Sequence, residues 1–310
     1  MQLSPVIRFL TNKEIDKACW DECIKQSPNR LLYARTFYLD NMAPGWDALI
    51  GENYDWVFPI TARRKYGISY LSQPPLSQQL GVFAKPNVIA PFANIVEWLK
   101  QYYRFWEINV NYSTDTRLIL PPVKISAATN FLLDLSADYK SMTAKYQKDL
   151  KKNIKRSERL QLRYQETNDY HKPIELFIKY YSGRLGNIKA KDYTNFSNIC
   201  GNRSQKNKLL VRKAVNSSNE ILSIALLFID GKRLYNLMNA TTEAGRKAEA
   251  NHFLFDSIIR EFAGTHFILD FEGSDVPGIN KFYKNFGGEN QPFYLLKYNN
   301  LPWPLNLFKE

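Results

Sequence analysis

The chain has 310 residues, of which 45% are hydrophobic, including 19 Phe and 19 Tyr, and its formal net charge is +12 at pH 7. This length and composition predict one or two packed domains and exclude a chain that is disordered in bulk. The positive charge favours anionic partners such as nucleic acid, a phosphorylated or CoA-like substrate, or an acidic membrane surface. A basic protein without such a partner fits equally well.

The cysteines and the apolar runs indicate the compartment. Cys19, Cys23 and Cys200 show neither a disulfide framework nor a metal-ligand spacing with the three His residues. We interpret them as small core residues of a reducing compartment and expect no metal site. The N-terminus lacks the apolar region of a signal peptide, and no apolar run is long enough to span a bilayer. We therefore expect a soluble, cytoplasmic protein without a transmembrane segment.

The first part of the chain has the pattern of two helices followed by a strand meander. In chain order we expect helices at 11–26 and 33–41, strands at 46–50, 55–67 and 68–83, a helix at 91–104, and strands at 105–111, 117–123 and 131–136. Residues 73–79, QPPLSQQ, are too polar and too rich in proline for a core strand. They form either a substrate-binding lip or an ordinary crossover loop.

Residues 138–160 change character and predict one long basic helix. Apolar side chains recur at every fourth position from Met142 to Ile154 and form its core face. Lys152 and Arg156 belong to its cationic face. That face is either a docking face for phosphates or nucleic acid or a solvated helix face.

The second part of the chain repeats this order of elements. We expect a strand at 160–166, helices at 171–186 and 192–200, strands at 209–215, 221–229 and 233–240, and a helix at 252–264. The inner face of the helix at 171–186 includes Ile178 and Tyr181. The meanders at 46–83 and 209–240 share one order of strands and turns, which predicts two tandem domains.

Residues 264–288 combine a strand end, a turn and a short helix. An apolar run at 267–269 predicts a buried strand, and the polar residues Asp270, Glu272 and Ser274 follow at its end. A Pro-Gly turn and a short amphipathic helix then lead to the closing glycine pair. Sites tend to be built at strand ends in α/β sheets, so the sequence predicts chemistry here.

The segment DFEG…INKFYKNFGG resembles FemAB-type aminoacyltransferases, in which a strand ending in Asp-Phe-x-Gly precedes an F-x-x-F-G ending. It is also similar to a helix of GNAT N-acyltransferases. The stretch KKNIKRSERL, at 151–160, resembles the opening of the second FemAB domain. The resemblance extends over 145–297, whereas residues 1–125 match in architecture only.

This resemblance implies an α+β fold of two tandem GNAT-like domains, each a mixed, mostly antiparallel sheet flanked by helices. We expect a first domain at 1–130 and a second at 131–297 that carries the motif, with the tail at 298–310 packed on the first. The implied activity is N-acyl or aminoacyl transfer to an amine. The donor would be acyl-CoA, aminoacyl-tRNA or another anionic or carrier-bound acyl group.

The resemblance also implies roles for individual residues. Tyr283 matches the tyrosine that protonates the leaving thiolate in GNAT enzymes, with a packing aromatic as the alternative. Glu272 is the candidate general base, while Asp270 either orients a substrate amine or caps the loop. FemAB-type chains have a lysine at the position of Tyr283. Lys284 lies one residue further, about 100° around a helix, and is a candidate for binding only.

Two further segments correspond to GNAT features. The strand at 233–240 matches the strand whose backbone stabilises the oxyanion, with residues 236–239 as candidates, and the next loop matches the pyrophosphate loop. The candidate binding residues here are Asn239, Gly245, Arg246 and Lys247. Two acidic residues of this loop, Glu243 and Glu249, would repel a pyrophosphate.

The alternative hypothesis is a protein that keeps the fold but binds an anionic ligand or nucleic acid without catalysis. It follows from the degenerate phosphate loop and from the missing lysine of the F-K-x-x-F-G pattern. The long heptad segment that serves tRNA in FemAB-type proteins also has no counterpart in this sequence.

Overall fold

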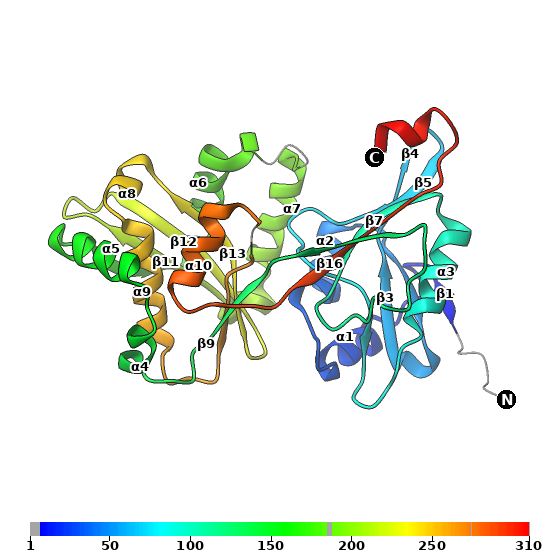
Figure 1. The fold of residues 1–310 in the computed structure, drawn as a ribbon, viewed down its shortest axis with the longest axis horizontal. Coiled ribbons are helices and arrows are strands. Elements are labelled where there is room, and N and C mark those ends of the chain that lie inside the picture. The colour runs from blue at the N-terminus through cyan, green and yellow to red at the C-terminus, as the bar shows by residue number, and fades with distance from the viewer. Residues whose placement is uncertain (1–6, 185–187, 274, 310) are drawn as a thin grey trace. The chain divides into compact units, whose positions relative to one another are not determined.

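The structure is a computed structural model that describes residues 7–184, 188–273 and 275–309, and its chain divides into two units (Figure 1). The first unit comprises residues 1–128 and 292–310, and the second comprises residues 129–291. The expected second domain ran on to residue 297. Strand β16 (Phe293–Asn299) instead belongs to the first unit, because it pairs with two strands there.

Two sheets and three α-helices build the described part of the first unit. The four-stranded sheet has the order β1 (Arg8–Leu10), β2 (Asp47–Ile50), β3 (Trp56–Ile60) and β6 (Phe83–Ala84). The five-stranded sheet has the order β4 (Ala62–Lys65), β5 (Ile68–Ser72), β7 (Phe105–Val110), β16 and β8 (Lys124–Ala128). The helices are α1 (Lys17–Gln26), α2 (Thr36–Met42) and α3 (Phe92–Tyr102).

Several elements of the first unit begin or end at other residues than the sequence predicts. The expected strand at 55–67 is divided between the two sheets at Thr61, and the strand expected at 117–123 lies at β8 instead. Helix α1 begins later than expected because the side chain of Asp16 accepts the N–H groups that open the helix. Cys19 is exposed, so its interpretation as a core residue is wrong, whereas the other two cysteines are buried.

The polar loop at 73–79 makes hydrogen bonds to other residues of the first unit. The Gln73 side chain accepts the N–H of Asn109 at 3.0 Å, and the fully buried Gln79 accepts the N–H of Tyr112 at 3.2 Å. These amides therefore brace β7 and the residues after it, as a crossover loop does.

A mixed seven-stranded sheet forms the centre of the second unit. Its order is β10 (Arg163–Thr167), β11 (Leu209–Val215), β12 (Ile221–Asp230), β13 (Arg233–Thr241), β14 (Ile268–Asp270), β9 (Phe131–Asp134) and β15 (Glu289–Asn290). The helices are α4 (Tyr139–Ala144), α5 (Lys148–Arg159), α6 (His171–Tyr181), α7 (Ala190–Gly201), α8 (Glu243–Lys247), α9 (Ala250–Phe262) and α10 (Pro277–Asn285).

The long basic helix expected at 138–160 is two helices. Asp138 caps α4 by accepting the N–H of Ser141, and the chain turns before α5, where Gln147 donates its N–H to the carbonyl of Asn285. In α6, Ile178 is 37% exposed, so its expected place on the inner face is wrong.

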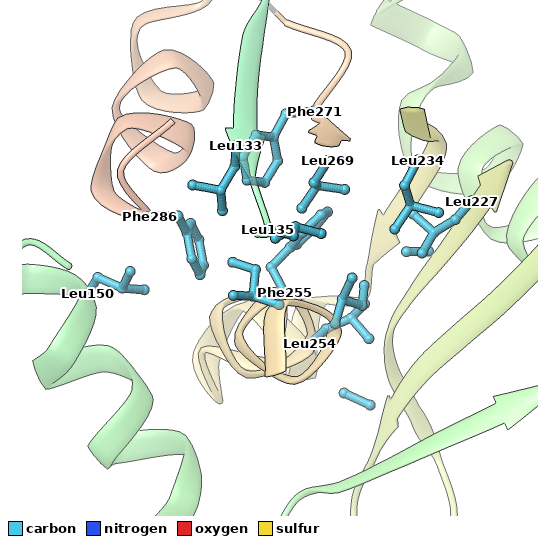
Figure 2. Packing of buried hydrophobic residues seen from close by; sticks show 14 of the residues in the cluster. Leu133, Leu135, Leu150, Leu227, Leu234, Leu254, Phe255, Leu269, Phe271 and Phe286 are labelled. Carbon is cyan, nitrogen blue, oxygen red and sulfur yellow. The ribbon is translucent and has the colours of Figure 1, made fainter. Parts of the chain in front are cut away.

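Helix α9 packs its apolar face into the main core of the second unit (Figure 2). Phe255 contacts the rings of Phe271, Phe282 and Phe286 with centroid distances of 5.6, 5.6 and 6.3 Å. Burying such a side chain stabilises the fold by about 1.5–3 kcal/mol. This cluster therefore fixes α10 and the end of β14, the two elements that carry the FemAB-like motif.

Candidate functional site

The candidate site lies where β13 and β14 separate. These parallel strands pair only over Arg233–Tyr235 with Ile268–Asp270, and β13 continues alone on this side to Thr241. A β-bulge interrupts the pairing of β12 with β13 at Leu237, which is skipped between Asn236 and Met238. Bulges commonly lie next to active sites because they redirect backbone and side chains.

Asp270 ends β14 and is almost fully buried. One carboxylate oxygen accepts from the guanidinium of Arg233 at 2.7 Å, and the other accepts the backbone N–H of Glu272 at 3.0 Å. The second Arg233 nitrogen donates to the Gln291 side chain at 2.7 Å. Asp270 thus caps the loop, which was one of its two expected roles, and positions the next residues.

Glu272 has a left-handed backbone conformation, with φ of +57°. This conformation is costly for a non-glycine residue and is found at functional sites where the surroundings impose it. Here Asp270 holds its N–H, and on the other side Gly273 donates its N–H to Asn130 at 2.9 Å. A Cβ at Gly273 would collide with the carbonyl oxygen of Thr129, which explains the glycine of the Asp-Phe-x-Gly pattern. Ser274 lies outside the described residues.

Tyr283 lies on α10 with its ring stacked on Phe271 at a centroid distance of 4.7 Å. Burial raises the pKa of the Tyr283 phenol above its ordinary value, and the negative charges of Glu272 and Asp270 raise this pKa further. The structure therefore brings together three predicted site residues: Tyr283, Glu272 and Asp270.

Tyr181 also contributes to the raised pKa of Tyr283, as the last residue of α6. The sequence predicted only a packing role for Tyr181. No signal in the sequence distinguishes it from its apolar neighbours on α6, because its proximity to Tyr283 depends on how α6 packs against the sheet.

Strand β13 supplies two asparagines to the same region. Asn239 donates its side-chain N–H to the carbonyl of Ile224 at 3.1 Å and so braces β12. The Asn236 Oδ1 is buried and has no hydrogen-bond partner among the described residues. Asn236 borders the bulge, which makes it the stronger candidate of the two for contact with a bound group.

Residues of the predicted phosphate loop make hydrogen bonds to neighbouring residues of their own segment. Gly245 is buried and donates its N–H to the Thr242 hydroxyl at 3.0 Å, and a Cβ at this position would collide with the carbonyl of Leu222. Arg246 donates to the carbonyl of Thr241 at 3.2 Å and lies over the ring of Tyr180. Lys247 is exposed. The loop thus presents cations, but its central N–H group is not available for a pyrophosphate.

The remaining predicted residues lie on helix surfaces. Lys152 and Arg156 are exposed on α5, and Arg156 lies 3.5 Å from the carboxylate of Glu249. Lys284 is exposed on α10, where its ammonium group lies 5.7 Å from the centre of the Phe131 ring. Arg156 and Lys284 thus make these contacts with residues other than Glu272 and Tyr283.

In the described part of the chain, no three or more His, Cys, Asp and Glu side chains gather where they could hold a metal ion. Among the helices of the described residues, none is long and apolar enough to cross a membrane.

Comparisons with known proteins support the fold. No family model and no curated protein sequence matches the chain. Among solved structures, FemX is 14% identical with a TM-score of 0.65, over 97% of this chain and 99% of FemX. A conserved protein of unknown function from Bacteroides thetaiotaomicron is 11% identical with a TM-score of 0.60, over 94% of this chain and 99% of that chain.

A third similar structure is the C-terminal domain of an Agrobacterium fabrum protein described as a lysylphosphatidylglycerol synthetase. It is 12% identical with a TM-score of 0.55, over 94% of this chain and 93% of that domain. The likeness in all three cases spans both units. The predicted α+β fold class is confirmed, because the chain has the two-unit fold of FemX.

Proposed function

We propose that this chain is an acyl- or aminoacyltransferase whose reaction centre lies in the second unit at Glu272 and Tyr283. The observation that carries the proposal is the placement of the Glu272 carboxylate, just after β14, near the Tyr283 phenol of α10, whose ring stacks on Phe271. Glu272 is held in a left-handed turn, and its charge acts on the phenol of Tyr283. The FemX-type fold and the FemAB-like motif support the same class of reaction.

The two groups match the two proton transfers of the reaction. The Glu272 carboxylate removes a proton from the acceptor amine, whose nitrogen attacks the acyl carbonyl carbon. The bond from that carbon to the leaving group then breaks, and Tyr283 gives its proton to the departing atom. Backbone N–H groups at the bulge beside Leu237 are the candidates for stabilising the tetrahedral oxyanion.

Two observations favour an oxygen ester over a thioester as the donor. The phosphate loop uses its central N–H internally, which weakens the case for CoA. Burial and negative neighbours raise the pKa of Tyr283, which makes it a weak acid. A thiol has an ordinary pKa near 8.5 and an alcohol a much higher one, so a weakly acidic phenol is better matched to protonating a leaving alkoxide than a leaving thiolate. Aminoacyl-tRNA is the donor that fits this chemistry.

The test compares donors with the purified chain. Acetyl-CoA and a mixture of aminoacyl-tRNAs are each incubated with a panel of primary amines, and amide products are measured by mass spectrometry. We expect product from aminoacyl-tRNA. Product from acetyl-CoA instead would contradict the ester donor. No product from either, with no thermal shift by either donor, would overturn the proposed function.

Tyr283→Phe and Glu272→Gln test the assigned roles once a donor reacts. Each change should lower the rate by about 10²- to 10⁴-fold, the usual contribution of a general acid or base. Tyr294→Phe is the matched control, because Tyr294 is a partly buried tyrosine of β16 in the first unit. Full activity of Tyr283→Phe would contradict the catalytic assignment even if transfer itself is confirmed.

A second candidate function is binding of nucleic acid without catalysis. It is favoured by the exposed cations of α5, including Lys152 and Arg156. The affinity for nucleic acid would then decrease steeply with salt concentration, and it would be lower in the Lys152→Gln variant than in the parent chain. Salt-sensitive binding of RNA without amide formation would favour this second candidate.

A further inference from the structure

One end of the five-stranded sheet of the first unit gathers four separate chain segments. Strand β5 runs parallel to β7, with Leu71 opposite Trp106, so the β4–β5 turn lies at the end where β7 begins. Asn299, at the end of β16, lies opposite Phe105 of β7. The start of β8 lies beside the same end of β16, with Lys124 opposite Lys297.

The C-terminal segment is anchored at this end. Asn300 donates its N–H to the carbonyl of Arg104 at 2.7 Å, and the Asn299 side chain donates to the carbonyl of Asn306 at 2.9 Å. The segment is therefore folded back into a turn. Figure 1 shows this turn, in red, at the same end of the unit as β4 and β5.

Large apolar side chains are exposed on the four chain segments that lead into or out of this end. Trp303 is 79% exposed, and Leu118 and Leu120 are each 67% exposed. We name the set the apolar end, and its members are Tyr66, Tyr102, Leu118, Leu120, Trp303, Leu305 and Leu307. Contiguous exposed apolar surface on a folded unit marks an interaction site, whereas isolated exposed residues do not.

Cations border the apolar end. All four residues of β4 are exposed, and three of them are Arg63, Arg64 and Lys65. Arg104 and Lys124 are exposed at the starts of the neighbouring strands. We name these five residues the basic rim. The acidic groups nearby are matched by cations outside the rim: Asp115 pairs with Arg117 at 2.8 Å, and Glu107 lies 3.7 Å from Lys297.

We propose that the apolar end and the basic rim together form a docking surface for an anionic lipid bilayer. Tryptophan and tyrosine are favoured where hydrocarbon meets lipid headgroups, and the leucines can enter the acyl boundary. Lys and Arg beside them are attracted by anionic headgroups. The chain would thereby lie on a membrane through its first unit without a spanning segment.

Charge and side-chain type favour a bilayer over other partners. A symmetric contact between two copies would place the two basic rims against each other, because the same patch faces itself. Nucleic acid would satisfy the cations but offers nothing comparable to hydrocarbon for the exposed leucines. A bilayer with anionic lipid satisfies both the apolar and the cationic groups. This proposal does not depend on the proposed transfer reaction.

The test is co-sedimentation of the full chain with vesicles. Vesicles of phosphatidylcholine alone are compared with vesicles that also contain phosphatidylglycerol, at low and high salt. We expect binding to the anionic vesicles that weakens with salt. Trp303→Ser/Leu305→Ser and Arg63→Gln/Arg64→Gln/Lys65→Gln should each lower the affinity at least about tenfold. Circular dichroism checks that each variant remains folded.

Two control variants locate the surface. Ile89→Ser removes an apolar residue that is 95% exposed on the loop before α3, and it should bind like the parent chain. Lys148→Gln/Lys151→Gln/Lys155→Gln removes the same number of cations from α5 as the β4 variant removes from the rim. The proposal is overturned if the parent chain does not bind, or if only the α5 variant loses binding. The proposal is equally overturned if the parent chain does not bind vesicles and light scattering shows that it is a dimer, with Trp303→Ser/Leu305→Ser a monomer.

Discussion

Glu272 is the residue at which local conformation and proposed chemistry coincide. Its left-handed backbone is unfavourable for an L-amino acid with a side chain. Two hydrogen bonds nevertheless hold it in place: the Glu272 N–H donates to Asp270, and the next N–H, of Gly273, donates to Asn130. A residue kept in such a conformation stores strain that a functional role would justify. The strain itself can be measured.

Glu272→Gly should stabilise the fold and remove the proposed activity. Glycine relieves the left-handed strain of about 1–2 kcal/mol but adds freedom to the unfolded chain, so the expected net gain is about 0.5–1 kcal/mol. Urea denaturation measures this gain. Glu272→Gln keeps the backbone strain and is the control, with no gain expected. Equal stability of the glycine variant and the parent chain would show that no strain is stored there.

At the scale of elements, α9 is held against α4 through a buried carboxylate, that of Asp256. The Tyr139 hydroxyl donates to Asp256 with oxygen–oxygen distances of 2.8 and 2.9 Å, and Arg260 lies 3.5 Å away. Burial raises the pKa of Asp256 above its ordinary value, while the hydrogen bond from Tyr139 and the charge of Arg260 partly oppose this rise. The charged form therefore costs stability in the folded state.

Asp256→Asn should change how stability depends on pH. Because the folded pKa of Asp256 is raised, its favourable contribution is full below the unfolded pKa and is lost as the pH rises through the folded pKa. The variant lacks this titration, so it should match the parent chain in acid and become the more stable of the two toward neutral pH. Urea denaturation of both proteins from acid to neutral pH checks this. A stability difference that does not vary with pH would contradict the shifted pKa.

At the scale of the whole molecule, the first unit is completed by the last part of the chain. Strand β16 lies between β7 and β8 and pairs with both over most of its length. The unit is thus built from two segments that are separated in the sequence by the whole second unit, residues 129–291. Its five-stranded sheet can form only after β16 has been made.

Removal of residues 292–310 should therefore unfold the five-stranded sheet. The truncation exposes the backbone of β7 and β8 on the sides where β16 pairs. It also removes the buried side chain of Leu296 from the core of the unit. Hydrogen exchange at β7 amides should lose its protection in the truncated chain. Removal of residues 301–310 alone is the control and should leave β7 protected. Protected β7 amides in the longer truncation would contradict this role of β16.

The sequence by itself determined the features that depend on local pattern. Alternation and turn residues predicted the strand meanders, and the DFEG and FYKNFGG segments predicted the FemX-type fold that the structural comparison confirms. The apolar residues at 224–229 do not alternate with polar ones, which predicts a strand buried on both faces, and β12 is almost continuously buried. Periodicity and short motifs are sufficient for such features because they are properties of neighbouring residues.

Only the tertiary structure decided the features that depend on distant residues. The break in the basic segment at 138–160 depends on a hydrogen bond from Gln147 to Asn285, and the proximity of Tyr181 to Tyr283 depends on the packing of α6. The place of β16 in the first unit and the exposed apolar end likewise result from strand pairing across the chain. No local pattern specifies such contacts. The free energy of packing or strand pairing depends on both of the segments involved, and these segments meet only in the folded state.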